Sequence, residues 1–208
     1  MNYDLGHLIQ DSKQDVLGPI QDDEALLLFA FIRCCRIKTV LEIGGLEGYS
    51  AINFLKAVSY SDASVVFSVE LQEMIKRTDN HIVIRKYAHD VTGTDVHNKL
   101  LGLVFFDCHD EADEMIIYNN LVTAGCIDDT TVLVLHDTNC HPKPNCVTKY
   151  EVGDGWVHQT SERKLVNWFK SLGYDCVCVH TKVTDHDASF PYRHGLTICR
   201  KFKKLEVQ

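Results

Sequence analysis

TVLEIGGLEGYSAINFLKAV, residues Thr39 to Val58, joins a short apolar strand to an amphipathic helix through a turn with three glycines. β-Branched and aliphatic residues favour a buried strand at its start, whereas Ala51, Ile52, Leu55 and Val58 share one face of the helix that follows. A strand, a glycine-rich turn and a helix start form a common type of cofactor pocket at the end of a sheet. The stretch therefore predicts an α/β fold with a binding site at this turn.

Strand and helix signals alternate along the rest of the chain. The expected strands are Thr39–Ile43, Val65–Val69, Ile82–Lys86, Leu103–Phe106, Val132–Leu135, Tyr174–His180 and Gly195–Phe202. The expected helices are Asp22–Arg36, Tyr49–Val58, Leu71–Thr78, Asp95–Leu101, Ala112–Val122 and Ser161–Leu172. Because the first five strands are apolar on both sides, we expect a parallel sheet covered by helices on both faces. The last two strands have no helix between them, which predicts an antiparallel hairpin at the sheet edge.

The expected architecture is thus α/β: a single Rossmann-like, doubly wound sheet of seven strands, mostly parallel, with an antiparallel last strand. One domain is expected, with an N-terminal helical segment at 1–38 and a cofactor-binding core at 39–139. Residues 140–208 are expected to supply acceptor-side loops and the C-terminal hairpin. Within them, His141–Gln159 has two prolines, two glycines and little periodicity, which predicts an irregular excursion.

Composition excludes several classes of partner. The chain has 208 residues and a formal net charge of -8, which argues against nucleic acid or an anionic membrane as a ligand. No apolar run approaches the roughly 20 residues needed to span a bilayer. The N-terminus lacks the layout of a signal peptide, so the nine cysteines are expected to be reduced thiols of a cytoplasmic protein.

The charged residues around the glycine turn that follows Ile43 distinguish between a dinucleotide and a cationic cofactor. Its glycines, Gly44, Gly45 and Gly48, do not match the G-x-G-x-x-G spacing of dinucleotide sites, and Glu42 and Glu47 would repel a pyrophosphate. A carboxylate at this position suits a cationic cofactor, and S-adenosylmethionine carries an ammonium and a sulfonium group. We expect Glu42 to neutralise the ammonium and the glycines to allow close approach of the backbone.

Further residues fit the other parts of the same cofactor. Ser50 at the helix start could donate a hydrogen bond to the cofactor carboxylate, and Glu70 at the end of the second strand could accept hydrogen bonds from both ribose hydroxyls. The adenine is expected near Ala88 and Asp90, after the third strand, and Asp107 is expected to border the cofactor.

The motif LEIGGLEGYS resembles the first motif of the class I S-adenosylmethionine-dependent methyltransferases. It is similar to the catechol and caffeoyl-CoA O-methyltransferase-like group and to the sugar and macrolide O-methyltransferase-like group. The resemblance extends roughly over residues 26–139 and includes GLTICRK, which looks like the last strand of the family.

A second group of polar residues follows the fourth and fifth strands. Asp107 ends one strand, and His136 and Asp137 end the other, so their side chains are expected to converge at one crevice. Converging carboxylates favour a divalent cation, and hard oxygen ligands suit Mg²⁺ or Ca²⁺. The resemblance implies the same, because these enzymes hold a cation with an aspartate after strand four and an Asp-Asn pair after strand five.

Asp107 and Asp137 match these aspartates, but Thr138 stands where the asparagine is expected, with Asn139 one residue later. The expected metal ligands are therefore Asp107, Asp137 and Asn139, with His136, His109 and Asp110 as alternatives for the third. Imidazole ligands would favour Mn²⁺, Fe²⁺ or Zn²⁺ over Mg²⁺. His136, Asp137 and His109 are the expected catalytic residues, with either histidine able to take the acceptor proton.

Three hypotheses follow. The leading one is a methyltransferase that moves a methyl group from S-adenosylmethionine to a hydroxyl of a small molecule or sugar, assisted by Mg²⁺ or Mn²⁺. The second is a non-catalytic S-adenosylmethionine-binding protein with a partner or regulatory role, and the third is a nucleotide-dependent oxidoreductase. A homodimer is left open, because residues 1–20 look too short to close the site alone.

Overall fold

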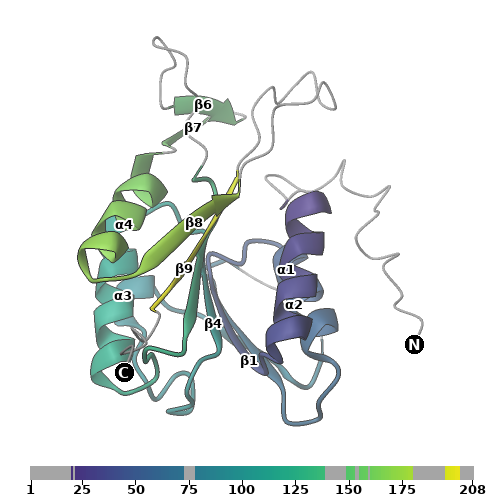
Figure 1. Ribbon diagram of the computed structural model, residues 1–208. Helices are drawn as coiled ribbons and strands as arrows, with labels where there is room; N and C mark the ends of the chain where they lie inside the picture. Colours follow the sequence, from purple (N-terminus) through teal and green to yellow (C-terminus); the bar gives the residue numbers. More distant parts are fainter. Residues whose placement is uncertain are drawn as a thin grey trace, which may run out of the picture.

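A seven-stranded sheet forms the centre of the computed structural model, which describes residues 20, 22–72, 78–138, 149–152, 155–158, 160–179 and 195–201 (Figure 1). Its strand order is β3-β2-β1-β4-β5-β9-β8. The strands are β1 (Thr39–Ile43), β2 (Val65–Val69), β3 (His81–Ile84), β4 (Leu103–Phe106), β5 (Val132–Leu135), β8 (Asp175–Val179) and β9 (Leu196–Arg200). β1 to β5 are mutually parallel, and β9 runs antiparallel to both of its neighbours. The predicted mostly parallel sheet with an antiparallel last strand is confirmed.

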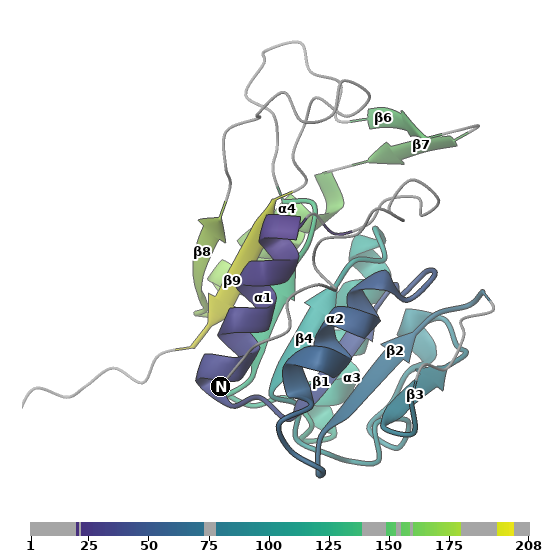
Figure 2. The same ribbon diagram turned by 90° about the vertical axis from the view of Figure 1, so that its right-hand side faces the viewer.

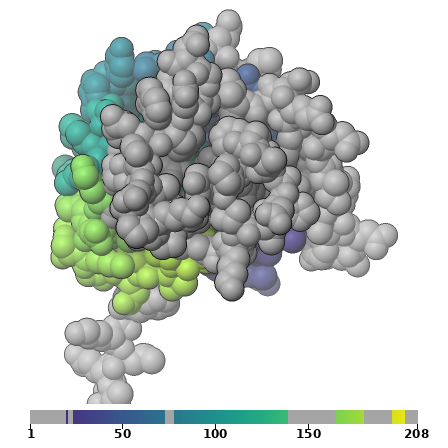
Figure 3. All heavy atoms as spheres, turned by 90° about the horizontal axis from the view of Figure 1, so that it is seen from above, coloured from purple at the N-terminus to yellow at the C-terminus, as the bar shows by residue number. Residues whose placement is uncertain are grey.

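Two helices cover each face of the sheet. α1 (Asp22–Cys35) and α2 (Tyr49–Val58) lie together on one face, and α3 (Glu111–Thr123) and α4 (Thr160–Ser171) lie on the other (Figures 1 and 2). Viewed from the carboxyl ends of the parallel strands, α4 in green lies near α3 in teal along one flank (Figure 3). None of the helices in the described part of the chain is long and apolar enough to cross a membrane.

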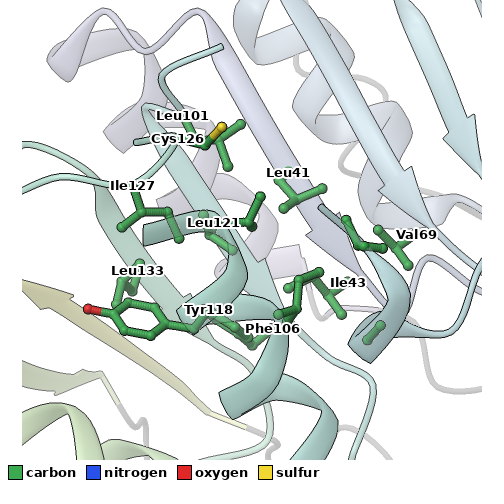
Figure 4. Close-up of a cluster of buried hydrophobic side chains, with 14 of the residues drawn as sticks. Leu41, Ile43, Val69, Leu101, Phe106, Tyr118, Leu121, Cys126, Ile127 and Leu133 are labelled. Atoms are coloured by element: carbon green, nitrogen blue, oxygen red, sulfur yellow. The ribbon is translucent and has the colours of Figure 1, made fainter. Parts of the chain in front are cut away.

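Alternation along the strands explains these two layers. In β4, Val104 and Phe106 pack into the cluster under α3 and α4, whereas Leu103 and Phe105 pack into the cluster under α1 and α2. All four side chains are fully buried, as expected for a strand covered on both faces. Figure 4 shows the first cluster, in which Phe106 lies close to Tyr118 of α3. The buried hydroxyls of Tyr118 and Tyr174 satisfy each other at 2.9 Å.

Two sequence predictions about local structure are wrong. No helix forms at Asp95–Leu101; residues 93–98 form turns instead, in which the Asp95 carboxylate accepts a hydrogen bond from the backbone N–H of Thr92. His97 and Asn98 have φ values of 55° and 51°, which a right-handed helix does not contain. The excursion at His141–Gln159 includes a regular antiparallel hairpin, β6 (Lys149–Val152) with β7 (Gly155–His158). The expected helix Leu71–Thr78 lies mostly outside the described residues.

The sheet order places one particular crevice at the centre. Successive strands are added outward in one direction from β1 to β3 and in the other direction from β4 to β5. The carboxyl ends of β1 and β4 therefore border the point where the strand order reverses, which is where open α/β sheets bind ligands.

Candidate functional site

The glycine turn is fixed by its packing against the end of β4. Gly44 has φ +89°, and a Cβ atom built there would lie 2.4 Å from the carbonyl oxygen of Asp107. The backbone N–H of Gly44 donates to the Val69 carbonyl at 3.0 Å, which ties the turn to β2 as well. Gly44 is therefore required by the close approach of β1 and β4, a reason that differs from the expected approach of a ligand. Gly48, at φ +82°, provides the left-handed residue that starts α2.

Glu42 lies beneath this turn and not at its rim. Its side chain is completely buried, and its carboxylate accepts hydrogen bonds from the hydroxyls of Ser50 on α2 and Ser68 on β2, the latter at 2.6 Å. The hydroxyl hydrogen of Ser50, expected to bind a cofactor carboxylate, is thus donated to Glu42. Ser68 in turn lies 3.0 Å from Nε2 of His81. The sequence pattern does not single out Ser68 or His81, because Ser68 lies inside an expected strand and His81 directly precedes one.

Burial dominates the ionisation of Glu42. Removal from water raises the pKa of the carboxyl from 4.5 to about 7, despite the opposing hydrogen bonds from Ser50 and Ser68. The negative charges of Asp107 and Glu70 raise this pKa further. Glu42 is therefore a carboxyl group whose charge responds to a nearby cation at neutral pH.

Glu70 holds the outer side of the turn. One carboxylate oxygen accepts from the backbone N–H of Leu46 at 2.7 Å, and the other accepts from that of Gln72 at 3.0 Å. Each carboxylate oxygen can accept a second hydrogen bond, so the carboxylate retains the capacity to accept from ribose hydroxyls. Leu46 itself has φ 41°, an uncommon value for leucine that follows from the tight turn.

The expected adenine contacts lie on a short 3-10 helix, η3 (Ala88–Asp90). Ala88 is buried in the core, whereas the Asp90 side chain is 60% exposed. Between them, Nδ1 of His89 lies 2.9 Å from the Asp113 carboxylate, which fastens η3 to α3. Burial tends to lower the pKa of His89, but the larger effect of the hydrogen bond to Asp113 raises it.

Strand register brings the second polar group together. Phe105 and Phe106 of β4 lie opposite Val134 and Leu135 of β5, so the next residues, Asp107 and His136, follow at the same level. Nδ1 of His136 lies 3.0 Å from the Asp107 carboxylate. Its Nε2 lies 3.2 Å from Oε2 of Glu24 on α1, whose Oε1 accepts from the backbone N–H of Gly195 at 2.7 Å.

His136 is buried among carboxylates, which favour the protonated form of its imidazole. Burial lowers the pKa of its imidazole, but the charges of Asp137 and Asp107, with the hydrogen bonds to Asp107 and Glu24, raise the pKa well above 6.5. Both ring nitrogens of the protonated form are N–H donors that face carboxylates. Only the neutral imidazole has a lone pair that can accept a proton, so the role of His136 as the base stays a prediction that requires its neutral form. From the sequence alone, Glu24 is only an acidic residue in the first turn of a helix. No local pattern links it to His136, which lies 112 positions away.

His109 completes a group that could hold a metal ion. One ligand atom each of Asp107, His109 and Asp137 lies within 4.8 Å of the other two. Nε2 of His109 is 3.6 Å from Asp137 and 3.8 Å from Asp107, and its side chain is 33% exposed. His109 and Asp137 have φ values of 58° and 55°, and uncommon backbone conformations of this kind concentrate at functional sites.

The structure describes some of the candidates for the third ligand but not the expected one. Thr138, at the asparagine position of the resemblance, is buried, and its hydroxyl accepts from that of Thr197 at 2.8 Å. Asn139 lies outside the described residues. Asp110, another alternative, caps α3 by accepting from the backbone N–H groups of Ala112 and Asp113. Both His109 and His136 lie next to the two aspartates, but His136 is buried and its other ring nitrogen faces Glu24, whereas His109 is partly exposed and groups with Asp107 and Asp137 as a possible metal site.

Solved structures share this fold over nearly the whole chain. A Staphylococcus aureus protein, provisionally assigned as a caffeoyl-CoA O-methyltransferase, superposes with a TM-score of 0.66 at 16% identity, covering 97% of this chain and 93% of that one. An O-methyltransferase from Bacillus cereus in complex with S-adenosylhomocysteine gives 0.64 at 15% identity, covering 95% and 90%. A methyltransferase from Podospora anserina with bound S-adenosylhomocysteine gives 0.62 at 14% identity, covering 97% and 89%. No protein-family model and no curated protein sequence matches the chain.

Proposed function

We propose that this chain is an S-adenosylmethionine-dependent O-methyltransferase that acts on a hydroxyl of a small molecule or sugar, assisted by a divalent cation. The observation that carries the proposal is the position of the glycine turn directly beside Asp107, His109 and Asp137, at the reversal of strand order. Structures with the same fold include an O-methyltransferase and a further methyltransferase, both with bound S-adenosylhomocysteine. Those likenesses support the reaction class but not the acceptor.

The acidic residues around the turn match a cationic cofactor. Burial, with a smaller contribution from the negative charges of Asp107 and Glu70, raises the pKa of Glu42 to about 7. A sulfonium and an ammonium group would relieve the repulsion, whereas a pyrophosphate would increase it. The bound cofactor would supply the methyl group for an in-line displacement, and the residues of the chain would orient the two reactants.

Asp107, His109 and Asp137 would hold the divalent cation. Two carboxylates and one imidazole suit Mn²⁺, Fe²⁺ or Zn²⁺ better than Mg²⁺. When bound, the cation would supply the Lewis acidity that lowers the pKa of an acceptor hydroxyl. His136 lies directly behind the two carboxylates and would keep them oriented, since it contacts Asp107 at 3.0 Å and Asp137 at 3.5 Å.

Calorimetry with S-adenosylhomocysteine, followed by turnover assays, tests this proposal. We expect binding by the wild type, and methyl transfer to hydroxylated acceptors that EDTA abolishes and Mn²⁺ restores. Asp107→Ala should lose metal-dependent turnover, whereas Asp62→Asn, which changes an exposed aspartate after α2, should retain it. Absence of S-adenosylhomocysteine binding in the wild type would refute the proposal.

The non-catalytic alternative rests on Thr138. Its hydroxyl bonds with Thr197, so the position that carries an amide ligand in the resembled enzymes is used here to join β5 to β9. If His109 does not replace that ligand, the chain would bind cofactor without turnover. Tight binding of S-adenosylhomocysteine with no detectable product over a broad acceptor panel, with or without Mn²⁺, would favour this alternative.

A further inference from the structure

Two cysteines face each other across the last two strands of the sheet. β8 and β9 lie side by side at one edge (Figure 1), and their register pairs Cys176 directly with Cys199. Directly opposite residues of antiparallel strands have Cα atoms about 4.5–5.5 Å apart and side chains on the same face. A disulfide needs a Cα separation of about 4.4–6.8 Å. The backbone therefore already places these two residues within bonding range.

The two thiols differ in accessibility and in acidity. Cys199 is fully buried in the core cluster, and Cys176 packs against that cluster while remaining partly exposed. A hydrogen bond from Cys199 lowers the pKa of Cys176, against the effect of burial, and the positive charge of Lys170 lowers it further. The same hydrogen bond, together with burial, raises the pKa of Cys199. The outer sulfur is thus the one favoured as a thiolate, and the inner thiol lies next to it, as in pairs of sensing and resolving cysteines.

We propose that Cys176 and Cys199 are a redox modification site, which closes to a reversible cross-strand disulfide when the protein meets a peroxide. In the first step the Cys176 thiolate attacks one peroxide oxygen; an S–O bond forms, the O–O bond breaks, and the leaving hydroxide takes a proton to become water. In the second step the Cys199 sulfur attacks the sulfenic acid; the S–S bond forms and the S–O bond breaks. The departing hydroxide takes the Cys199 proton as a second water. Two thiols are oxidised by two electrons, and one peroxide is reduced to two waters.

The neighbouring thiol provides a matched control. Cys178 lies on the same strand and is more exposed than Cys176, but the residue opposite it is Thr197, whose hydroxyl oxygen lies 3.2 Å from the Cys178 sulfur. If accessibility alone decided oxidation, Cys178 would react first. If the position opposite another cysteine decides the outcome, the disulfide should join Cys176 to Cys199 and leave Cys178 unpaired by a disulfide.

The new bond would tie the edge strand to the body of the sheet. β9 pairs with β5 on its other side, so β8 would become covalently joined to a strand whose partner leads into Asp137. It would also close a covalent loop between residues 176 and 199, which reduces the freedom of the unfolded chain. A disulfide that is partly exposed at a sheet edge is open to attack by reductants. We therefore expect higher thermal stability in the oxidised form and reversal by mild reductants.

The experiment uses the full chain treated with hydrogen peroxide, after which free thiols are blocked and the protein is digested with trypsin under non-reducing conditions. The expected product joins peptides 171–182 and 194–200, with the loss of two hydrogens, and fragmentation should place the bond between Cys176 and Cys199. Cys176→Ser should abolish this product, and Cys178→Ser should retain it. A cross-link that is lost in Cys178→Ser but kept in Cys176→Ser would overturn the proposal, as would oxidation of Cys176 without any cross-link.

Thermal unfolding gives a second readout that avoids changing the buried cysteine. The melting temperature of the wild type should rise on peroxide treatment and return to its starting value with dithiothreitol. Cys176→Ser, altered only at the partly exposed position, should show no such reversible rise. An equal reversible rise in Cys176→Ser would contradict the assignment. The outcome does not depend on methyl transfer, so it stands apart from the proposed function.

Discussion

Replacing Glu42 with glutamine should stabilise the protein at alkaline pH and change its stability much less at acidic pH. The pKa of the buried carboxyl is raised from 4.5 to about 7. The folded state therefore binds the proton more tightly than the unfolded state. The resulting stability is fully present below pH 4.5 and is lost as the pH rises toward 7. A pKa change of this size corresponds to roughly 3 kcal/mol.

Urea unfolding at pH 5, 6, 7 and 8 measures the effect. Glutamine keeps an oxygen that can accept from the Ser50 or Ser68 hydroxyl, and it carries no charge at any of these values. Between pH 5 and pH 8 the wild type should lose roughly 2–3 kcal/mol of unfolding free energy relative to Glu42→Gln. The slope of free energy against urea should be the same for both proteins, because the surface exposed on unfolding is unchanged.

Glu47→Gln is the control for this measurement. It makes the same chemical change in the same turn, but at an exposed side chain, so its pH dependence should follow that of the wild type. If Glu42→Gln and wild type also gave parallel curves, the carboxyl would not be held in a dry environment. The account of the acidic turn would then be refuted.

Three further predictions concern the same crevice. Gly44→Ala should destabilise the protein by about 1–3 kcal/mol more than Gly125→Ala in chemical denaturation. Both glycines have positive φ, but of the two only Gly44 has backbone atoms where the Cβ would lie. Equal losses of stability would contradict the packing argument. Binding of S-adenosylmethionine at pH 7 should release protons, because the cationic cofactor favours the ionised form of Glu42. In calorimetry the observed binding enthalpy should therefore depend on the ionisation enthalpy of the buffer. Glu42→Gln should lose this dependence. Asp107→Asn should weaken Mn²⁺ binding at least about tenfold in a calorimetric titration, and unchanged affinity would remove Asp107 from the ligand set.

The fold could be predicted because burial on both faces leaves a clear pattern in short strands. β4 and β5 consist entirely of large apolar residues, and their observed bounds equal the predicted ones. Asp95–Leu101 misled the prediction because its apolar spacing suits a helix. The Asp95 side chain instead bonds with the backbone of Thr92, and this local competition decides the conformation. Side-chain capping of that kind does not appear in hydrophobic periodicity.

The positions of the site residues could be predicted more readily than the directions of their side chains. Glu42, Glu70 and Asp107 follow from strand ends, since parallel strands finish at one edge of the sheet. The sequence could not indicate that Glu42 faces inward, because this depends on Ser68, which lies opposite it in the register of β1 and β2. Glu24 could not be found either, since its contact with His136 depends on how α1 packs across the sheet.

The buried imidazole of His136 helps to explain how several carboxylates can share this crevice. Asp107, Asp137 and Glu24 all lie next to His136, and their charges and hydrogen bonds raise the pKa of its imidazole. The protonated form would offset one of these negative charges, and His109 also lies near Asp107 and Asp137. Carboxylates at such short range repel each other strongly unless cations are close. A protonated His136 would offset part of the negative charge, and the remainder would favour cationic ligands such as the sulfonium cofactor and the metal ion of the proposed function.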